Sequence, residues 1–364
     1  MKIIKGILVF FTLILFSSTT MAAVIIVDKG GSGDALTIQG GLDLAGSGDT
    51  VTVNAGTYVE NITMVGGVVL ISSSGPGSTI INGNGDMCIS ADLCGPGNRI
   101  SGFTLTNGGG YIGGGVRVYD HTEIEIDNNI FLNNHTSYEG AGVSVQMYST
   151  ADIHDNDFIG NISYKSSAIT VIEYAQATIT NNFFNNNTST NYAGVIGVNR
   201  SSVVVEWNRI VENRSGSYAG NIDLFVATCE LRHNTFLRNL APYGASCIRD
   251  GGSSQLIAEY NLFAHNSGGA PAVRAVDCQI FSFNIFWDNG IDYIGPCDPI
   301  GTADNAHVNS MVCQPTGDDC AVSQFSPCLT GPGGLIGFNP AAGCTDNVVS
   351  VETESWGSLK ALFR

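Results

Sequence analysis

The stretch ITNNFFNNNTSTNYAG, residues 179–194, looks like low-complexity sequence, yet it is one copy of a repeat. Its core is the pattern Asn-x-(Phe/Ile)-x-x-Asn, which occurs seven times. Successive copies start 27, 26, 26, 26, 27 and 23 residues apart. A nearly constant period of this length is typical of solenoid repeats. The first Asn residues of the seven copies are Asn129, Asn156, Asn182, Asn208, Asn234, Asn261 and Asn284.

Each copy also carries two short stretches that have the pattern of β-strands. One alternates apolar and polar residues before the Asn, with Ile153, Ile179 and Val205 at the same position three residues upstream. The other lies earlier in the copy, as in GGVRVY (residues 114–119). This alternation indicates strand, and no segment inside the array is long enough for a crossover helix. The sequence therefore predicts an all-β solenoid with parallel strands stacked from coil to coil.

We interpret the seven Asn residues as structural. Asn tolerates a left-handed backbone at a sharp turn better than other residues that carry a side chain. Because neighbouring strands lie about 4.8 Å apart, its amide can also bond to the Asn one coil away. The apolar residue two positions later should then form an inner column, made of Phe131, Phe158, Phe184, Ile210, Phe236, Phe263 and Phe286.

A family resemblance rests on the NNxF turns and on the opening stretch GDALTIQGGLDLAGSGDTVTVNAGTYVENITM, residues 33–64. Both resemble the right-handed parallel β-helix superfamily of secreted bacterial proteins, of the pectate-lyase-like type, over roughly residues 24–340. The resemblance implies a short helix that caps the first coil. Ile38, Leu42 and Ala45 would face inward on it, and Asp34 would be its N-cap. It is weak evidence for function because this architecture carries many activities.

The two ends of the chain predict export and a cap. Residues 1–23 combine a basic start, an apolar stretch and small residues near Ala23, which is typical of a secretory signal peptide. We place the β-helix in residues 24–296, a Cys-rich C-terminal cap in 297–345, and a linker and tail in 346–364. The tail is either a docking segment or a sorting signal. We expect a secreted or cell-surface protein with no membrane span after cleavage.

All ten cysteines follow the signal segment, and five of them lie between Cys297 and Cys344. An even number in an exported protein predicts disulfides, although their pairing does not follow from the sequence. Cys88 and Cys94 could close a small loop. Zinc binding is the alternative, but the chain has no CxxC pair.

The formal net charge of −17 bounds the partners. Such a surface repels nucleic acid and anionic membranes, so we expect neither as a partner. We also expect no cofactor. A structural calcium ion is the alternative, although the acidic residues form no recognisable calcium loop. The oligomeric state is not predicted.

Candidate catalytic residues follow the early strand of the repeats. The resemblance implies carboxylates on one outer face, but the signature motifs of the polygalacturonase-like, pectinesterase-like and alginate-epimerase proteins are absent. Asp120, Glu173 and Arg200 could gather on one face if this strand stacks in register, with the two carboxylates on the order of 10 Å apart. A solvated, mixed polar surface is the alternative. His154, His233, His265 and His307 share no register, and we assign them no role.

One Tyr falls just before the early strand in six copies. We see two alternatives for this column. The rings either stack on one another and cover the turn, or they form an exposed platform for a sugar chain. The six residues are Tyr111, Tyr138, Tyr164, Tyr192, Tyr218 and Tyr243.

These observations favour an exported, non-enzymatic protein that binds a polysaccharide or a partner on a cell surface. The first alternative is a carbohydrate-active enzyme, either a polysaccharide lyase or a glycoside hydrolase, that acts on the outer face of the solenoid. The second alternative is a purely structural surface protein.

Overall fold

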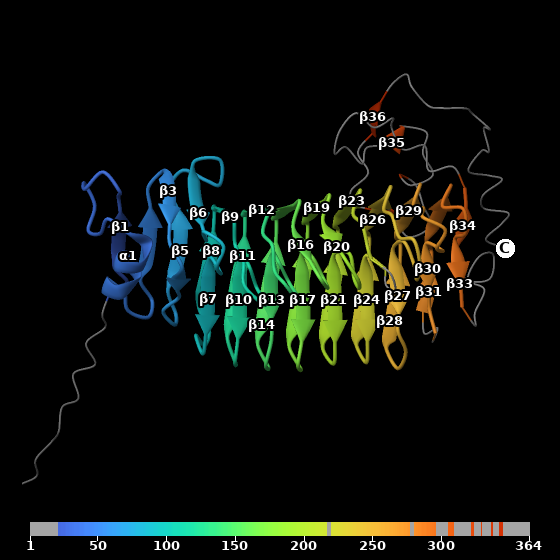
Figure 1. The fold of residues 1–364 in the computed structure, drawn as a ribbon, viewed down its shortest axis with the longest axis horizontal. Coiled ribbons are helices and arrows are strands. Elements are labelled where there is room, and N and C mark those ends of the chain that lie inside the picture. Colours follow the sequence, from blue (N-terminus) through green and yellow to red (C-terminus); the bar gives the residue numbers. More distant parts are fainter. Residues whose placement is uncertain are drawn as a thin grey trace, which may run out of the picture.

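The computed structural model describes residues 21–216, 220–276 and 280–295, together with 305–308, 322–323, 329, 336–337 and 342–344. In this part of the chain, three parallel sheets run along the long axis of the molecule, and most coils contribute one strand to each (Figure 1). The predicted all-β parallel solenoid is confirmed. The predicted signal peptide and C-terminal tail lie outside the described residues.

The sheets are named A, B and C. Sheet A contains β1 (Val24–Val27), β2 (Thr50–Val53), β5 (Val69–Ser72), β8 (Asn98–Ser101), β11 (Glu123–Asp127), β14 (Thr150–His154), β18 (Gln176–Thr180), β22 (Ser202–Glu206), β25 (Thr228–Arg232), β28 (Gln255–Glu259) and β31 (Ile280–Ser282). Sheet B contains β3 (Gly56–Val59), β6 (Thr79–Asn82), β9 (Thr104–Thr106), β12 (Ile130–Leu132), β15 (Asp157–Ile159), β19 (Phe183–Asn185), β23 (Arg209–Val211), β26 (Thr235–Leu237), β29 (Leu262–Ala264), β32 (Ile285–Trp287) and β34 (Ala306–His307).

Sheet C, which carries the site described below, contains β4 (Ile62–Thr63), β7 (Ile89–Asp92), β10 (Val116–Tyr119), β13 (Val143–Val145), β17 (Ile169–Ile172), β21 (Ile196–Asn199), β24 (Ile222–Phe225), β27 (Ile248–Asp250), β30 (Val273–Arg274) and β33 (Tyr293–Ile294). Two smaller pairs are β16 (Ile162–Ser163) with β20 (Thr188–Ser189), and β35 (Val322–Ser323) with β36 (Ala342–Cys344). Figure 1 shows β35 and β36 beside the C-terminal coils.

The short helix α1 (Ile38–Leu44) covers the first coil. Ile38 and Leu42 are buried against the core, as the resemblance implied. The prediction that Asp34 is the N-cap is wrong. The helix begins after Thr37, whose side chain accepts a hydrogen bond from the Gly40 N–H at 3.0 Å. Asp34 lies too far upstream to reach the helix and accepts instead from the Ile26 N–H at 2.8 Å.

The interior is filled by columns of apolar side chains. Phe131, Phe158 and Phe184 are fully buried, and their rings stack with centroids 4.6 and 4.9 Å apart. A second run joins Phe236, Phe263 and Phe286 at 4.9 Å, and Ile210 lies between the two runs in register. Stacked aromatic rings of this kind add to the stability that burial itself supplies.

The seven repeat Asn residues form a buried ladder of hydrogen bonds. For example, the Asn182 Oδ1 accepts from the Asn156 N–H at 3.0 Å and from its side-chain amide at 3.1 Å, while Asn182 donates to the Ile153 carbonyl at 2.8 Å. The ladder continues to Asn305, and a second ladder follows the last Asn of each repeat pattern. Polar groups buried at the turns are thereby paired.

Our explanation for the left-handed turns is off by one residue. The ladder residues do not have a positive φ; the residue directly before each of them does, as at Asn181 (φ 56°), Trp207 (φ 58°) and Tyr260 (φ 58°). The ladder Asn therefore supplies hydrogen bonds, and its neighbour supplies the sharp turn. Bulky residues tolerate this strained backbone here because their rings stack from coil to coil, as in the run Trp207, His233, Tyr260 and Phe283.

The described cysteines are buried thiols. Cys88 and Cys94 do not pair, so the predicted small disulfide loop is absent: the Cys88 Sγ lies 3.6 Å from the Thr106 carbonyl and the Cys94 Sγ 3.5 Å from the Asp92 carbonyl. Cys229 and Cys247 are likewise free and buried. The side chains of the six remaining cysteines lie outside the described residues. In the described ranges we find no helix with the length and hydrophobicity that a membrane crossing requires.

Candidate functional site

The predicted catalytic residues occupy one turn of the solenoid, the turn that leads from sheet C to sheet A. Asp120, Glu173 and Arg200 follow β10, β17 and β21, and all three have a positive φ. Asp120 and Glu173 are two coils apart, with Met147 at the equivalent turn of the coil between them. The Asp120 carboxylate lies 2.6 Å from the neighbouring His121 ring, and Arg200 lines a shallow pocket with Tyr174. The structure therefore aligns the three residues but gives them no common pocket.

The Tyr column combines features of both alternatives. Tyr111, Tyr138 and Tyr164 stack with ring centroids 4.8 and 6.1 Å apart, yet 62% of Tyr111 and 41% of Tyr164 remain exposed. Because stacked rings cover one another's faces, the column presents mostly ring edges and hydroxyl groups to solvent. Tyr192 breaks the stack, since its ring is turned by 67° relative to Tyr164. Tyr243 is 67% exposed, and Tyr218 lies outside the described residues.

Polar residues concentrate on the outer face of sheet C. At one outward position the strands carry residues that pair in register from coil to coil, so their side chains form a row about 4.8 Å apart. Gly197 interrupts this row, and the Ser166 side chain fills the space beside it, since a Cβ at position 197 would lie 1.9 Å from the Ser166 hydroxyl oxygen. The row consists of Arg117, Ser144, Thr170, Gly197, Asp223, Arg249 and Arg274.

A pocket of about 260 Å³, which we call the first pocket, is lined by Gly197 and Ser166. Glu139 and Lys165 line one side of it, and the Lys165 Nζ lies 3.5 Å from the Glu139 Oε1. Lys165 also donates to the Tyr138 hydroxyl at 3.0 Å, and its Nζ lies 4.8 Å from the centre of the Tyr192 ring. A cation between two aromatic rings is held in place by electrostatic attraction to both.

The pKa values of Glu139 and Lys165 are both shifted in the first pocket. Burial raises the pKa of Glu139, although the charge of Lys165 partly opposes this shift. Burial alone would lower the pKa of Lys165, but the bond to Tyr138 and the charge of Glu139 raise it on balance. The carboxyl group is 11% exposed, so a proton on it is sheltered from solvent. A raised pKa widens the pH range over which this carboxyl can carry a proton.

A second ion pair closes the other side of the first pocket. Arg249 binds both carboxylate oxygens of Asp223, with distances of 2.5 and 3.0 Å. Burial raises the pKa of Asp223, while Arg249 opposes the shift. Such bidentate pairs fix the orientation of both groups. Asp223 is therefore held rigidly with its side chain 12% exposed.

A second pocket of about 540 Å³ adjoins the first, and Arg249 lines both. It is lined by Tyr243, Arg274 and Ile294, among other residues. Together the two pockets form what we call the sheet C groove. It extends over the strands from β17 to β33, and five strand spacings correspond to about 24 Å.

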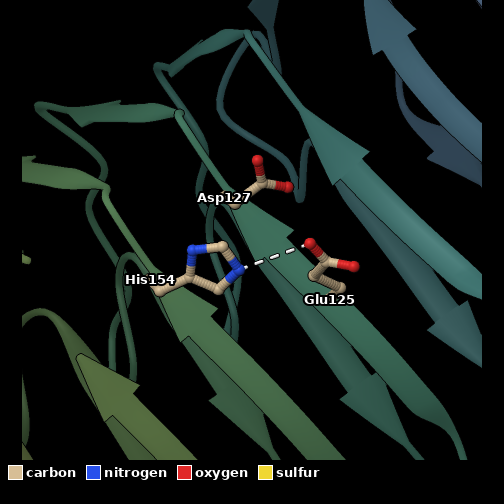
Figure 2. Close-up of side chains that lie close together, drawn as sticks. All are labelled: Glu125, Asp127 and His154. Carbon is tan, nitrogen blue, oxygen red and sulfur yellow. Dashed lines mark hydrogen bonds and ion pairs between the residues drawn. The ribbon is translucent and has the colours of Figure 1, made fainter. Parts of the chain in front are cut away.

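A separate cluster on the outer face of sheet A has the composition of a metal site. Figure 2 shows Glu125, Asp127 and His154 on the neighbouring strands β11 and β14, and their ligand atoms lie within 4.8 Å of one another. However, Arg99 binds both oxygens of Asp127 at 2.7 Å, and His154 donates to or accepts from Glu125 at 3.3 Å. The guanidinium already supplies the positive charge that a cation would bring. We therefore interpret the cluster as an ion-pair network.

Sequence reasoning missed Glu139, Lys165 and Asp223, although the repeat period contains a signal for them. Glu139 directly follows Tyr138, and Lys165 directly follows Tyr164 one coil later. Opposite charges at equivalent positions of successive coils should pair. The same rule joins Asp223 and Arg249, which lie 26 residues apart. It also applies to His154, which we had given no role and which lies in register with Asp127.

The comparison with family models agrees with the architecture. A family model described as "Right handed beta helix region" matches residues 114–300, which is half of the chain. A search of curated proteins gives no match. Among solved structures, the chain is similar to the A-module of the mannuronan C-5 epimerase AlgE6 of Azotobacter vinelandii, with 13% identity and a TM-score of 0.26. That alignment covers 74% of this chain and 93% of the module.

Proposed function

Because the chain belongs to the right-handed β-helix family, we propose that it uses the outer face of its solenoid to bind a polysaccharide along the sheet C groove. The observation that carries this proposal is that the two pockets follow one another along sheet C and share Arg249 as a lining residue. An extended groove of about 24 Å that follows the strand stack suits a linear chain of repeating units. We also retain the proposals that the protein is of the pectate-lyase-like type and that it is exported through residues 1–23.

The chemistry of the groove supports a sugar ligand. Tyr192 and Phe225 provide apolar ring surface in the first pocket, and Thr170 and Asn199 provide hydroxyl and amide groups beside it. Sites for small polar ligands typically combine apolar walls with a few oriented polar groups. In the second pocket, Arg274 is exposed and suits a carboxylate of a uronate unit.

A binding experiment tests the proposal. The secreted protein is titrated with a panel of uronate and neutral polysaccharides by isothermal calorimetry, alongside the variant Tyr192→Ala. We expect one or more polysaccharides to bind, and we expect the variant to bind them about tenfold more weakly, as is common for a buried aromatic contact.

The matched control is Tyr148→Ala. Tyr148 is 55% exposed and stacks between His121 and Tyr174 at the turn towards sheet A, outside both pockets. Its removal should leave the affinity unchanged. Equal weakening by both substitutions, or no binding to any polysaccharide of the panel, would remove the proposal. Thermal melting of both variants separates a loss of binding from a loss of folding.

The enzymatic alternative is favoured by one observation, the pair of sheltered carboxyl groups in the first pocket. It involves Glu139 and Asp223 rather than Asp120 and Glu173.

A further inference from the structure

The turn that leads from sheet C to sheet A has two lengths. In two adjacent coils it has a single left-handed residue, Arg200 in one and Val226 in the next. The strand register shows that the turn is one residue shorter in these two coils than in the coils on either side. Four other described coils have two consecutive residues with a positive φ at this turn, namely Asp120–His121, Met147–Tyr148, Glu173–Tyr174 and Gly252–Ser253.

The short turns end an aromatic stack. The rings of His121, Tyr148 and Tyr174 stack across three coils, with centroids 5.3 and 5.4 Å apart. Each ring belongs to the second left-handed residue of its turn, and the coil of Arg200 has no such residue. Tyr174 is 60% exposed, and among the described residues no ring or cation lies against its other face. The stack therefore stops with one free aromatic face.

A pocket of about 420 Å³, which we call the third pocket, lies at the end of this stack. Tyr174, Arg200 and Val226 line it, together with the exposed residues Ser202 and Thr228 at the start of neighbouring strands of sheet A. Its volume falls in the range of about 300–1,000 Å³ that is usual for small-molecule sites. The shorter turns thus leave space for a ligand at the next position of the stack.

We propose that the third pocket binds a planar aromatic ring that carries a carboxylate. The ring continues the stack on the free face of Tyr174, about one strand spacing of 4.8 Å further along the solenoid. The carboxylate binds the Arg200 guanidinium, which is exposed and forms no hydrogen bond or ion pair with any described residue. The third pocket shares no lining residue with the sheet C groove, so this inference goes beyond the proposed function and does not depend on it.

Val226 supports a binding role because its backbone is unfavourable for a β-branched residue. Its φ is 52°, in the left-handed region, and its side chain is 44% exposed, so burial offsets little of the strain. Turns after strands of sheet B carry Asn133 and Asn186 in this conformation, which suits Asn better. Strained residues cluster at ligand sites. Val226 lies two coils beyond Tyr174, about 10 Å away, which leaves room for one ring between them.

The test titrates the full chain with 2-naphthoate, a planar aromatic carboxylate, by isothermal calorimetry. We expect one site per chain. Tyr174→Asn removes the ring but suits the left-handed backbone at this position (φ 65°), and it should weaken binding about tenfold or more. Arg200→Gln should weaken the binding of 2-naphthoate about tenfold and leave the affinity for the neutral 2-naphthamide unchanged.

A second variant fills the pocket from the protein side. One tyrosine inserted between Arg200 and Ser201 restores the longer turn and places a ring where the ligand binds, so this variant should fold and lose 2-naphthoate binding. The matched control is Tyr111→Asn, because Tyr111 is also the end ring of a stack and is 62% exposed, but it lines none of the three pockets. Its affinity should equal that of the wild type. Thermal melting separates a loss of binding from a loss of folding, and if Tyr174→Asn does not fold, the insertion variant decides.

Several outcomes would overturn the inference. They are no binding of 2-naphthoate by the wild type, equal weakening by Tyr174→Asn and Tyr111→Asn, wild-type affinity of Arg200→Gln, and retained binding by a folded insertion variant. Binding of D-glucuronate as tight as that of 2-naphthoate would also overturn it, because a non-planar carboxylate would then serve as well as an aromatic one. None of these outcomes bears on polysaccharide binding in the sheet C groove, so the proposed function would remain intact.

Discussion

Replacing one ladder residue, Asn182→Ala, should destabilise the protein far more than its small size suggests. The substitution removes an acceptor from the Asn156 N–H and from the Asn156 amide, and a donor from the Ile153 carbonyl. The Asn208 Oδ1 also loses the side-chain amide of residue 182 as a donor, but it still accepts from the backbone N–H of that residue. The Asn156 N–H is then buried without its partner.

The magnitude follows from these bonds. A buried donor left without an acceptor costs about 1–3 kcal/mol, and each further lost bond about 1 kcal/mol. We therefore expect the free energy of unfolding to fall by about 4 kcal/mol. This is a large fraction of the stability of a typical domain, which is about 5–15 kcal/mol. Urea unfolding followed by circular dichroism measures the change by linear extrapolation.

The control is the adjacent substitution Asn181→Ala. Asn181 is exposed and has a φ of 56°, so Ala there loses no ladder bond but must adopt a left-handed backbone, at a cost of about 1–2 kcal/mol. If Asn181→Ala destabilises the protein as much as Asn182→Ala, the ladder does not stabilise the coils in the way described. A cost below about 1 kcal/mol for Asn182→Ala would refute the reasoning in the same way.

Three further predictions concern pH, thiols and the groove. Burial opposes protonation of His154, but Asp155 and other carboxylates raise its pKa on balance. The stability that protonated His154 contributes is fully present below the unfolded pKa of about 6.5 and is lost as the pH rises through the folded pKa. His154→Gln should therefore flatten the pH dependence of the free energy of urea unfolding from about pH 6.5 upward. An unchanged pH dependence in the variant contradicts this prediction. Burial raises the pKa of Cys88 and of Cys229 to about 12. Ellman's reagent at about pH 8 should therefore modify neither thiol until the protein is unfolded. Modification of either residue in the native protein, mapped by mass spectrometry, would count against this prediction. Gly197→Ala should abolish polysaccharide binding measured by calorimetry without unfolding the chain, because the new Cβ pushes the Ser166 side chain towards the first pocket. A variant that binds with wild-type affinity would show that the ligand does not use the space beside Ser166.

The fold follows from the sequence because it depends on spacing. A period of about 26 residues, with Asn and Phe at fixed offsets, leaves few alternatives to stacked coils. The prediction that the ladder Asn itself takes the left-handed backbone at the turns was wrong. The left-handed residue directly precedes the ladder Asn and is often bulky, as with Trp207. Nothing in local propensity favours Trp in that conformation. Stacking on His233 of the next coil makes it acceptable, and this contact exists only in the assembled solenoid.

The site was harder to predict for a different reason. Asp120 and Glu173 were chosen because they follow strands, but neither residue lines any of the three pockets described above. Glu139 lies before its strand in a stretch that resembles an ordinary turn, and its burial depends on Lys165 and Thr170 of the next coil. Pairing opposite charges at the repeat period would have indicated it. The openness of the pocket could not be predicted, because it depends on how the Ser166 side chain lies beside Gly197.

The ladder has a direction, and this sets how the molecule can change its length. Each Asn offers its Oδ1 to the coil before it, and the first member, Asn129, accepts an ordinary backbone N–H from Phe103. A deletion of one coil of 26 residues, such as 182–207, would therefore restore every ladder bond at the junction, because Asn156 would meet Asn208 as it now meets Asn182. The same deletion would remove Tyr192 and Gly197 from the first pocket. The groove has no such freedom, since an inserted coil between β24 and β27 would separate Asp223 from Arg249. The Asn ladder therefore tolerates a change in the number of coils, whereas an ion pair between neighbouring coils, such as that of Asp223 with Arg249, does not.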